Sequence, residues 1–262
     1  MKKRRKWGQN FLADPEIAGR ILDLANISPD DTVLEIGPGR GILTQDLIQR
    51  SSQLTVLEID PALCANLRER FSALPNFHLI QADALKFDYS CLGLRFQVVS
   101  NLPYYAATHI LKRLIHYRNR IHAMTVMLQK EVVDRLTAQP RQKEYGSLSV
   151  FIQYHCKVER ALEVKKESFS PPPKIDSSVI RLTPLAQPKV AVTDERTFFK
   201  IVHAAFLHKR KMLKSNLKEW QKQFEVGEGK IKLAEIDLTR RGETLSLQDF
   251  ALISNHICSK KE

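Results

Sequence analysis

The first 180 residues alternate short apolar runs with segments in which apolar residues recur at helical spacing. The apolar runs, rich in β-branched residues and typical of buried strands, span residues 32–37, 54–60, 77–82, 96–100 and 124–128. Helical patterns begin at Asp14-Pro15 and also cover residues 42–50, 61–71, 106–117 and 131–136. This alternation predicts an α/β fold, a mostly parallel sheet with helices on both faces.

The regular pattern changes after residue 136. Residues 147–154 and 158–164 resemble two strands joined without a helix, which predicts a hairpin, and residues 178–182 predict one more strand. We therefore expect an antiparallel element at the end of the parallel sheet.

A second change in composition begins at Thr183. Pro184 and Pro188 indicate a linker over residues 184–193, between a first domain of residues 1–183 and a small helical domain of residues 194–262. In the helical domain, one helix face carries Leu213, Leu217, Trp220 and Phe224, and the opposite face carries Lys211, Lys214, Lys218 and Lys222.

The charge balance of the chain is strongly basic. Its 262 residues include 41 Lys and Arg against 29 Asp and Glu, a net charge of +12. Such an excess indicates a polyanionic partner, either nucleic acid or an anionic membrane surface. No run approaches the roughly 20 apolar residues that span a bilayer. The 4 cysteines and 8 histidines lack metal-ligand or redox spacing, which favours a cytoplasmic protein without a metal.

The first strand runs into a glycine-rich turn with the sequence Glu35-Ile36-Gly37-Pro38-Gly39-Arg40-Gly41. Glycines allow a tight turn and a close approach of a ligand to the backbone. A dinucleotide-binding fingerprint requires a small residue where this chain has Ile42, so a smaller nucleoside cofactor is the better interpretation. A turn of this kind can also be purely structural.

Two carboxylates follow the next two strands. Glu58 ends the second strand, where it can accept hydrogen bonds from both hydroxyls of a ribose above the glycine turn. Asp83 ends the third strand and can accept a hydrogen bond from an adenine amine, although a helix or turn cap is an equal alternative. Asp60 is predicted to cap the helix that begins at Pro61. The carboxyl edge of an open α/β sheet is where ligands bind.

The sequence Asn101-Leu102-Pro103-Tyr104 ends the fourth strand. The side-chain carbonyl of Asn101 and the main-chain carbonyl of Leu102 could each accept a hydrogen bond from one N–H of an adenine amine, which would direct the nitrogen lone pair toward an electrophile. Tyr104 offers a face on which a base can stack. Taken alone, this segment could equally be a turn with an exposed tyrosine.

In these motifs the chain resembles the ribosomal RNA adenine dimethyltransferases, specifically the bacterial enzymes of the small subunit. The resemblance covers nearly the whole chain and also rests on three further segments, Gly8-Gln9-Asn10-Phe11-Leu12, residues 169–177 (FSPPPKIDS) and residues 206–217 (FLHKRKMLKSNL). It implies a Rossmann-like methyltransferase fold with a seven-stranded sheet, plus a helical C-terminal domain that orients RNA.

The resemblance also implies residue roles. S-adenosylmethionine would be covered by Asn10 and Leu12 and held by Gly37, Gly39, Glu58, Asp83, Ala84 and Asn101. Tyr104 and Phe169 would sandwich the target adenine. The implied substrate is a pair of adjacent adenosines near the 3′ end of small-subunit rRNA in an assembling 30S subunit, modified by a monomer.

Two alternatives stay open at this stage. A relative of the same fold methylates large-subunit rRNA, although the pattern from Phe206 onward favours the small-subunit enzyme. An RNA-binding assembly factor that has lost methylation is a second alternative, which the presence of Asn101, Tyr104, Glu58 and Asp83 opposes.

Overall fold

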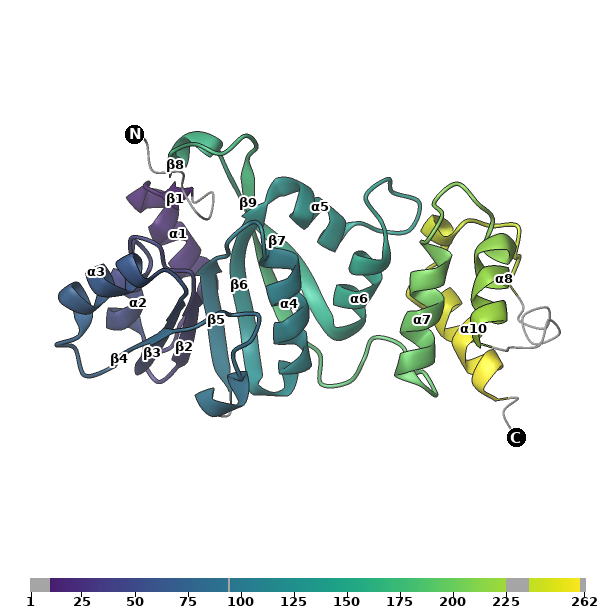
Figure 1. Ribbon diagram of the computed structural model, residues 1–262, viewed down its shortest axis with the longest axis horizontal. Helices are drawn as coiled ribbons and strands as arrows, with labels where there is room; N and C mark the ends of the chain where they lie inside the picture. The colour runs from purple at the N-terminus through teal and green to yellow at the C-terminus, as the bar shows by residue number, and fades with distance from the viewer. Residues whose placement is uncertain (1–9, 94, 225–235, 260–262) are drawn as a thin grey trace. The chain divides into compact units, whose positions relative to one another are not determined.

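The computed structural model describes residues 10–93, 95–224 and 236–259. The chain divides into two compact units, which are described separately (Figure 1). The first unit contains Met1–Val133 and Lys157–Pro184, and the second contains Asp134–Cys156 and Leu185–Glu262.

A seven-stranded sheet in the order β4-β3-β2-β5-β6-β9-β7 forms the first unit. Its strands are β2 (Thr32–Ile36), β3 (Gln53–Glu58), β4 (Phe77–Gln81), β5 (Phe96–Asn101), β6 (Ile121–Gln129), β7 (Cys156–Val164) and β9 (Ser177–Pro184). The strands from β4 to β6 pair in parallel, and β9 pairs antiparallel with β6. The predicted Rossmann-like fold with an antiparallel end is confirmed.

Helices also belong to this unit, and two of them begin at the predicted caps. The helices are α1 (Pro15–Ala25), α2 (Thr44–Arg50), α3 (Pro61–Phe71) and α4 (Ala107–His116), with 3-10 turns at Tyr89–Leu92, Arg118–Arg120 and Lys166–Ser168. A further helix, α5 (Lys130–Thr137), begins in this unit and ends in the second. Asp14 accepts from two N–H groups of α1, and Asp60 accepts from the N–H of Ala62. α1 packs against β6 and β9, and α3 against β3 and β4 (Figure 1).

A second, two-stranded sheet was not predicted. β1 (Phe11–Leu12) pairs antiparallel with β8 (Phe169–Ser170), with Leu12 opposite Phe169. The connection is extended by a hydrogen bond from Ala13 N to Ser168 O. Two segments that lie more than 150 residues apart in the sequence are therefore held side by side.

The second unit is built from α6 (Ser147–His155), α7 (Glu195–Ala205), α8 (Leu213–Phe224) and α10 (Leu247–Cys258), with a 3-10 turn at Gly242–Thr244. Its core includes Tyr154, Phe198, Leu217 and Phe250. On α8, Leu213 and Leu217 are buried while Lys214 and Lys218 are exposed, as predicted. The side chains of Trp220, Lys222 and Phe224 lie outside the description.

The predicted hairpin of residues 147–154 and 158–164 is wrong, because residues 147–154 form α6. This segment is rich in β-branched and aromatic residues, which favour strands, but it packs against α7 in a helical core. The predicted linker also packs within this unit, where the N–H of Leu185 donates to His155 O and that of Lys189 to Tyr154 O. The second unit thus differs from the predicted helical domain by including residues 134–156.

Candidate active site

A cavity of about 320 Å³ lies at the carboxyl ends of the parallel strands in the first unit. Its size falls in the range of small-molecule sites. Leu102 and Tyr104 line this cavity. So do all the predicted cofactor-binding residues, which are Asn10, Leu12, Gly37, Gly39, Glu58, Asp83, Ala84 and Asn101. The structure therefore places every candidate site residue except Phe169 in the cavity wall.

The glycine-rich turn forms the floor of the cavity. Gly37, Gly39 and Gly41 have φ values of +66°, +59° and +79°, a region that other residues rarely adopt. A Cβ atom on Gly39 would lie 2.7 Å from Cδ1 of Phe11. The guanidinium of Arg40 lies 4.8 Å from the centre of the Phe11 ring. β1 therefore lies directly against the turn, and only glycine fits between them.

Glu58 lies at the end of β3 and is buried. Its Oε1 accepts hydrogen bonds from the N–H groups of Ile59 (2.8 Å) and Asp60 (2.9 Å). Burial raises the pKa of this carboxyl, and the hydrogen bonds from Asp60, Ile59 and Gly39 oppose the rise. Asp83 closes a turn by accepting from the N–H of Leu85, so it has the predicted turn-cap contact as well as a place in the cavity wall.

Glu35 is a third carboxyl in the cavity wall, and the sequence did not predict it as a site residue. It is 1% exposed and its Oε2 accepts from Thr44 Oγ1 at 2.6 Å. Burial raises its pKa to about 8. Because Glu35 keeps its proton below about pH 8, Glu58 and Asp83 are the carboxylates that suit the cavity to a ligand with positive charge and several hydrogen-bond donors.

Asn101 and Leu102 follow directly from β5. Asn101 Oδ1 is buried and has no hydrogen-bond partner among the described residues, whereas the N–H of Leu102 donates to Met127 O. Buried acceptors without a partner are rare in folded proteins, because each one costs free energy. Asn101 lies in the cavity wall, and no hydrogen bond within the described residues explains why its side-chain carbonyl is buried there.

Tyr104 lines the cavity, and Phe169 lies beside it rather than in the cavity wall. Their ring centroids are 6.4 Å apart and their planes make an angle of 64°. Phe169 is 3% exposed. A base between two parallel rings needs about 7 Å between them, twice the usual contact distance. The rings are adjacent as expected, but in this structure they touch edge to face.

The cavity wall contains further residues for which the sequence predicted no site role, and two of them, Gln129 and Tyr105, are polar. Gln129 ends β6, beside the end of β5, and the rule that ligands bind at the carboxyl edge could have identified it. Tyr105 follows Tyr104 and is 57% exposed. Burial, together with the charges of Asp83 and Glu58, raises the pKa of its hydroxyl.

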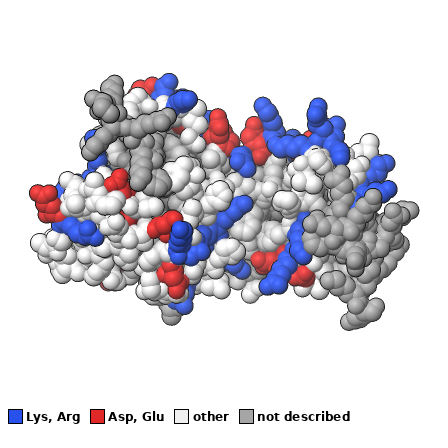
Figure 2. All heavy atoms as spheres, in the orientation of Figure 1, with Lys and Arg blue, Asp and Glu red and all other residues white. Residues whose placement is uncertain are grey.

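Within the described ranges, no group of three His, Cys, Asp or Glu side chains could hold a metal ion. No helix in the same ranges is long and apolar enough to cross a membrane. Lys and Arg side chains are spread over the face shown in Figure 2.

Comparison with known proteins gives a consistent result. Residues 1–257 match the family model for ribosomal RNA adenine dimethylase. A protein named ribosomal RNA small subunit methyltransferase A from Clostridium botulinum (strain Loch Maree / Type A3) is 42% identical over 259 residues, 98% of this chain and 94% of the relative. The protein of the same name from Geobacillus thermodenitrificans (strain NG80-2) is 42% identical over 266 residues, 96% of this chain and 90% of the relative.

Two solved structures are similar over most of their length. A dimethyladenosine transferase from Plasmodium falciparum has a TM-score of 0.78 at 24% identity, covering 93% of this chain and 95% of the other. The 23S rRNA methyltransferase ErmE has a TM-score of 0.72 at 27% identity, covering 95% of this chain and 100% of the other. Taken with the cavity at the sheet edge, these matches show that the chain belongs to the ribosomal RNA adenine dimethylase family, whose cofactor is S-adenosylmethionine.

Proposed function

We propose that this chain transfers methyl groups to the exocyclic amines of two adjacent adenosines near the 3′ end of small-subunit rRNA, giving dimethyladenosines during assembly of the 30S subunit. The observation that carries the proposal is the buried, unpartnered Oδ1 of Asn101 in a cavity whose wall also contains Tyr104. The relatives named as small-subunit methyltransferases support this choice of RNA.

The residues of the cavity fit the cofactor. Gly37 and Gly39 have no side chains, so a ligand can lie against their backbone. Glu58 accepts from backbone N–H groups at Oε1, and its carboxylate has acceptor sites left for the ribose hydroxyls. Asp83 and the backbone of Ala84 would hold the adenine ring of the cofactor. Asn10 and Leu12, beside the turn, would cover it.

S-adenosylmethionine supplies an electrophilic methyl group on a sulfonium. The protein contributes position and polarity to the transfer. In the first transfer, Asn101 Oδ1 and the carbonyl of Leu102 each accept a hydrogen bond from one N–H of the target amine, so that its lone pair faces the methyl group. Once methylated, the nitrogen is acidic and releases a proton to solvent, and no strong base is needed.

The target adenine must leave its stack to reach the cavity. Stacking on Tyr104 and Phe169 is worth about 1–3 kcal/mol per base, which offsets part of the few kcal/mol that extrusion costs. In the structure the rings touch edge to face, so entry of the base requires them to separate and turn toward parallel. Basic residues, including Lys214 and Lys218 on α8, would hold the RNA backbone, and the predicted domain of residues 194–262 would orient it.

We further propose that the protein acts as a monomer in the cytoplasm. Transfer of labelled methyl groups from S-adenosylmethionine to immature small subunits, mature small subunits, naked rRNA and large subunits tests the whole proposal. Label in dimethyladenosine of the immature small subunit is the expected result. Label confined to large subunits would favour the activity named for ErmE. No label on any RNA would favour an assembly factor without methylation.

A further inference from the structure

Ser177 has no assigned role, although it ends the FSPPPKIDS segment that carries Phe169. It is the first residue of β9 and is fully buried. Its Oγ lies 2.6 Å from the hydroxyl oxygen of Tyr104, a hydrogen bond in which either oxygen can donate. Within the described ranges, the side chain of Ser177 makes no other hydrogen bond.

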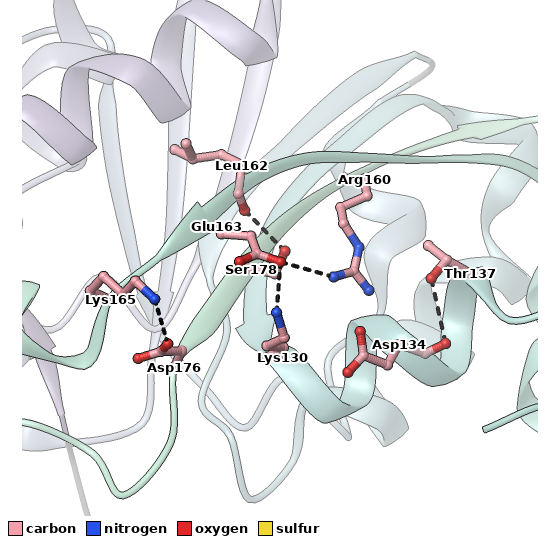
Figure 3. A network of polar contacts seen from close by, with 9 residues as sticks. All are labelled: Lys130, Asp134, Thr137, Arg160, Leu162, Glu163, Lys165, Asp176 and Ser178. Carbon is pink, nitrogen blue, oxygen red and sulfur yellow. Dashed lines mark hydrogen bonds and ion pairs between the residues drawn. The ribbon is translucent and has the colours of Figure 1, made fainter. Parts of the chain in front are cut away.

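The residues on either side fix the direction of Ser177. Asp176 accepts a hydrogen bond from the N–H of Lys166. Asp176 also accepts from Lys165 Nζ, and Ser178 Oγ donates to Leu162 O (Figure 3). Successive side chains of a strand point to opposite faces of the sheet. Ser177 therefore projects away from the side on which Ser178 is bound.

The backbone at Ser177 is equally well fixed. Ser177 pairs in register with Gln129 of β6, and the N–H of Lys130 donates to Asp176 O. Gln129 itself belongs to the cavity wall. The hydroxyl of Ser177 is thus presented from a rigid strand pair at the edge of the site.

Tyr104, by contrast, stands on a turn after β5. A phenolic oxygen lies on the axis about which the tyrosine ring rotates, so a hydrogen bond at that oxygen holds the axis in place and leaves the ring plane free to turn. That combination suits a ring that meets Phe169 at 64° and must become parallel to a base. Burial raises the pKa of Tyr104, which keeps its hydroxyl protonated and able to take part in the bond.

We propose that Ser177 is a positioning residue, which holds the axis of Tyr104 so that the ring forms one wall of the site for the target adenine. This inference rests on the proposed function, because it assumes that Tyr104 stacks on the base. Ser177 itself touches neither the RNA nor the cofactor.

The test compares Ser177→Ala, Tyr104→Phe and the double variant, with Ser178→Ala as the matched control. Ser178 is also fully buried in β9 and also makes one side-chain hydrogen bond, but to Leu162 O. Steady-state kcat and KM are measured on undermethylated small subunits, and thermal unfolding shows that each variant is folded at the assay temperature.

Ser177→Ala and Tyr104→Phe should each lower kcat about fivefold, the equivalent of one lost hydrogen bond, with KM for both substrates unchanged. The double variant should be no slower than either single variant, because both changes remove the same bond. Ser178→Ala should keep the wild-type kcat.

Three results would overturn the inference: a wild-type kcat in Ser177→Ala, effects of the two single variants that multiply in the double variant, or an equal loss in Ser178→Ala. If Ser177→Ala does not fold, Tyr104→Phe alone decides, since a wild-type kcat there shows that the bond is dispensable. Tyr104→Ala separates this inference from the proposed function. If Tyr104→Ala keeps the wild-type kcat, the stacking role of Tyr104 is refuted. If Tyr104→Ala loses activity while Ser177→Ala keeps the wild-type kcat, only the role of Ser177 is refuted.

Discussion

Replacing Asn101 by alanine should lower activity and raise stability at the same time. Asn101 Oδ1 is buried without a hydrogen-bond partner among the described residues, and its residue belongs to the cavity wall. Loss of one group that polarises a reacting atom lowers kcat by a factor of about 10²–10³, which corresponds to a rise of about 2.7–4 kcal/mol in the activation free energy. An unpaired buried acceptor costs the folded state about 1–3 kcal/mol, and the substitution removes that cost.

The stability gain can be measured without ligands. Relief of about 1 kcal/mol should raise the melting temperature of a chain of this size by about 2–4 °C. Single-turnover methylation of undermethylated small subunits at saturating cofactor gives the chemical rate, separate from binding.

Thr125→Val is the matched control. Thr125 lies in the neighbouring strand β6, its Oγ1 is also buried without a partner in the described part of the chain, and it is not in the cavity wall. This variant should gain similar stability and keep the wild-type rate. A rate for Asn101→Ala within about threefold of wild type, well short of the loss expected for a polarising group, would refute the reasoning. So would a loss of rate accompanied by a lower melting temperature, because that would indicate a structural role.

Three further predictions concern the glycine-rich turn, the buried Glu35 and the net charge of the chain. Gly39→Ala should weaken cofactor binding at least tenfold in calorimetry, because its Cβ would lie 2.7 Å from Phe11 at a φ of +59°, whereas Gly93→Ala, also at positive φ but with open space around its Cβ, should bind normally. Equal losses in both would show that strain alone is responsible. The free energy of unfolding of the cofactor-free protein should fall by a few kcal/mol between pH 4.5 and about 8, because folded Glu35 retains a proton that the unfolded carboxyl has released. Denaturant unfolding of Glu35→Gln should show a shallower fall of the free energy of unfolding with pH. Identical pH profiles for the variant and the wild type would contradict the raised pKa of Glu35. RNA affinity should fall steeply and linearly with the logarithm of salt concentration, since a chain of net charge +12 displaces counterions from phosphates; a flat response in filter binding would rule out a backbone contact of this kind.

The parallel part of the fold was predictable because its strands are apolar runs of five to nine residues separated by helices with clear boundaries. Asp14 and Asp60, each followed by proline, identified the starts of α1 and α3 correctly. In α6, residues on nearly all sides are buried, including Ser149, Gln153 and His155, so the helical period is hidden and the β-branched composition misled the analysis.

Two other features could not be seen in the sequence. β1 and β8 have two residues each, too few to show any period, and their pairing is a long-range contact. Glu35 is recognisable as part of a glycine motif, but its burial and its bond to Thr44 depend on the folded core. The candidate site was predictable where residues end parallel strands, and less so where they come from turns or from the second sheet.

The most direct test of the central claim is a crystal structure of the protein with S-adenosylhomocysteine and a short RNA that contains the target adenosines. The account predicts that the amine of one extruded adenine lies within about 3.2 Å of Asn101 Oδ1 and the Leu102 carbonyl, with its ring between Tyr104 and Phe169. An adenine bound elsewhere, with the two rings still in contact at a centroid distance of 6.4 Å, would contradict it.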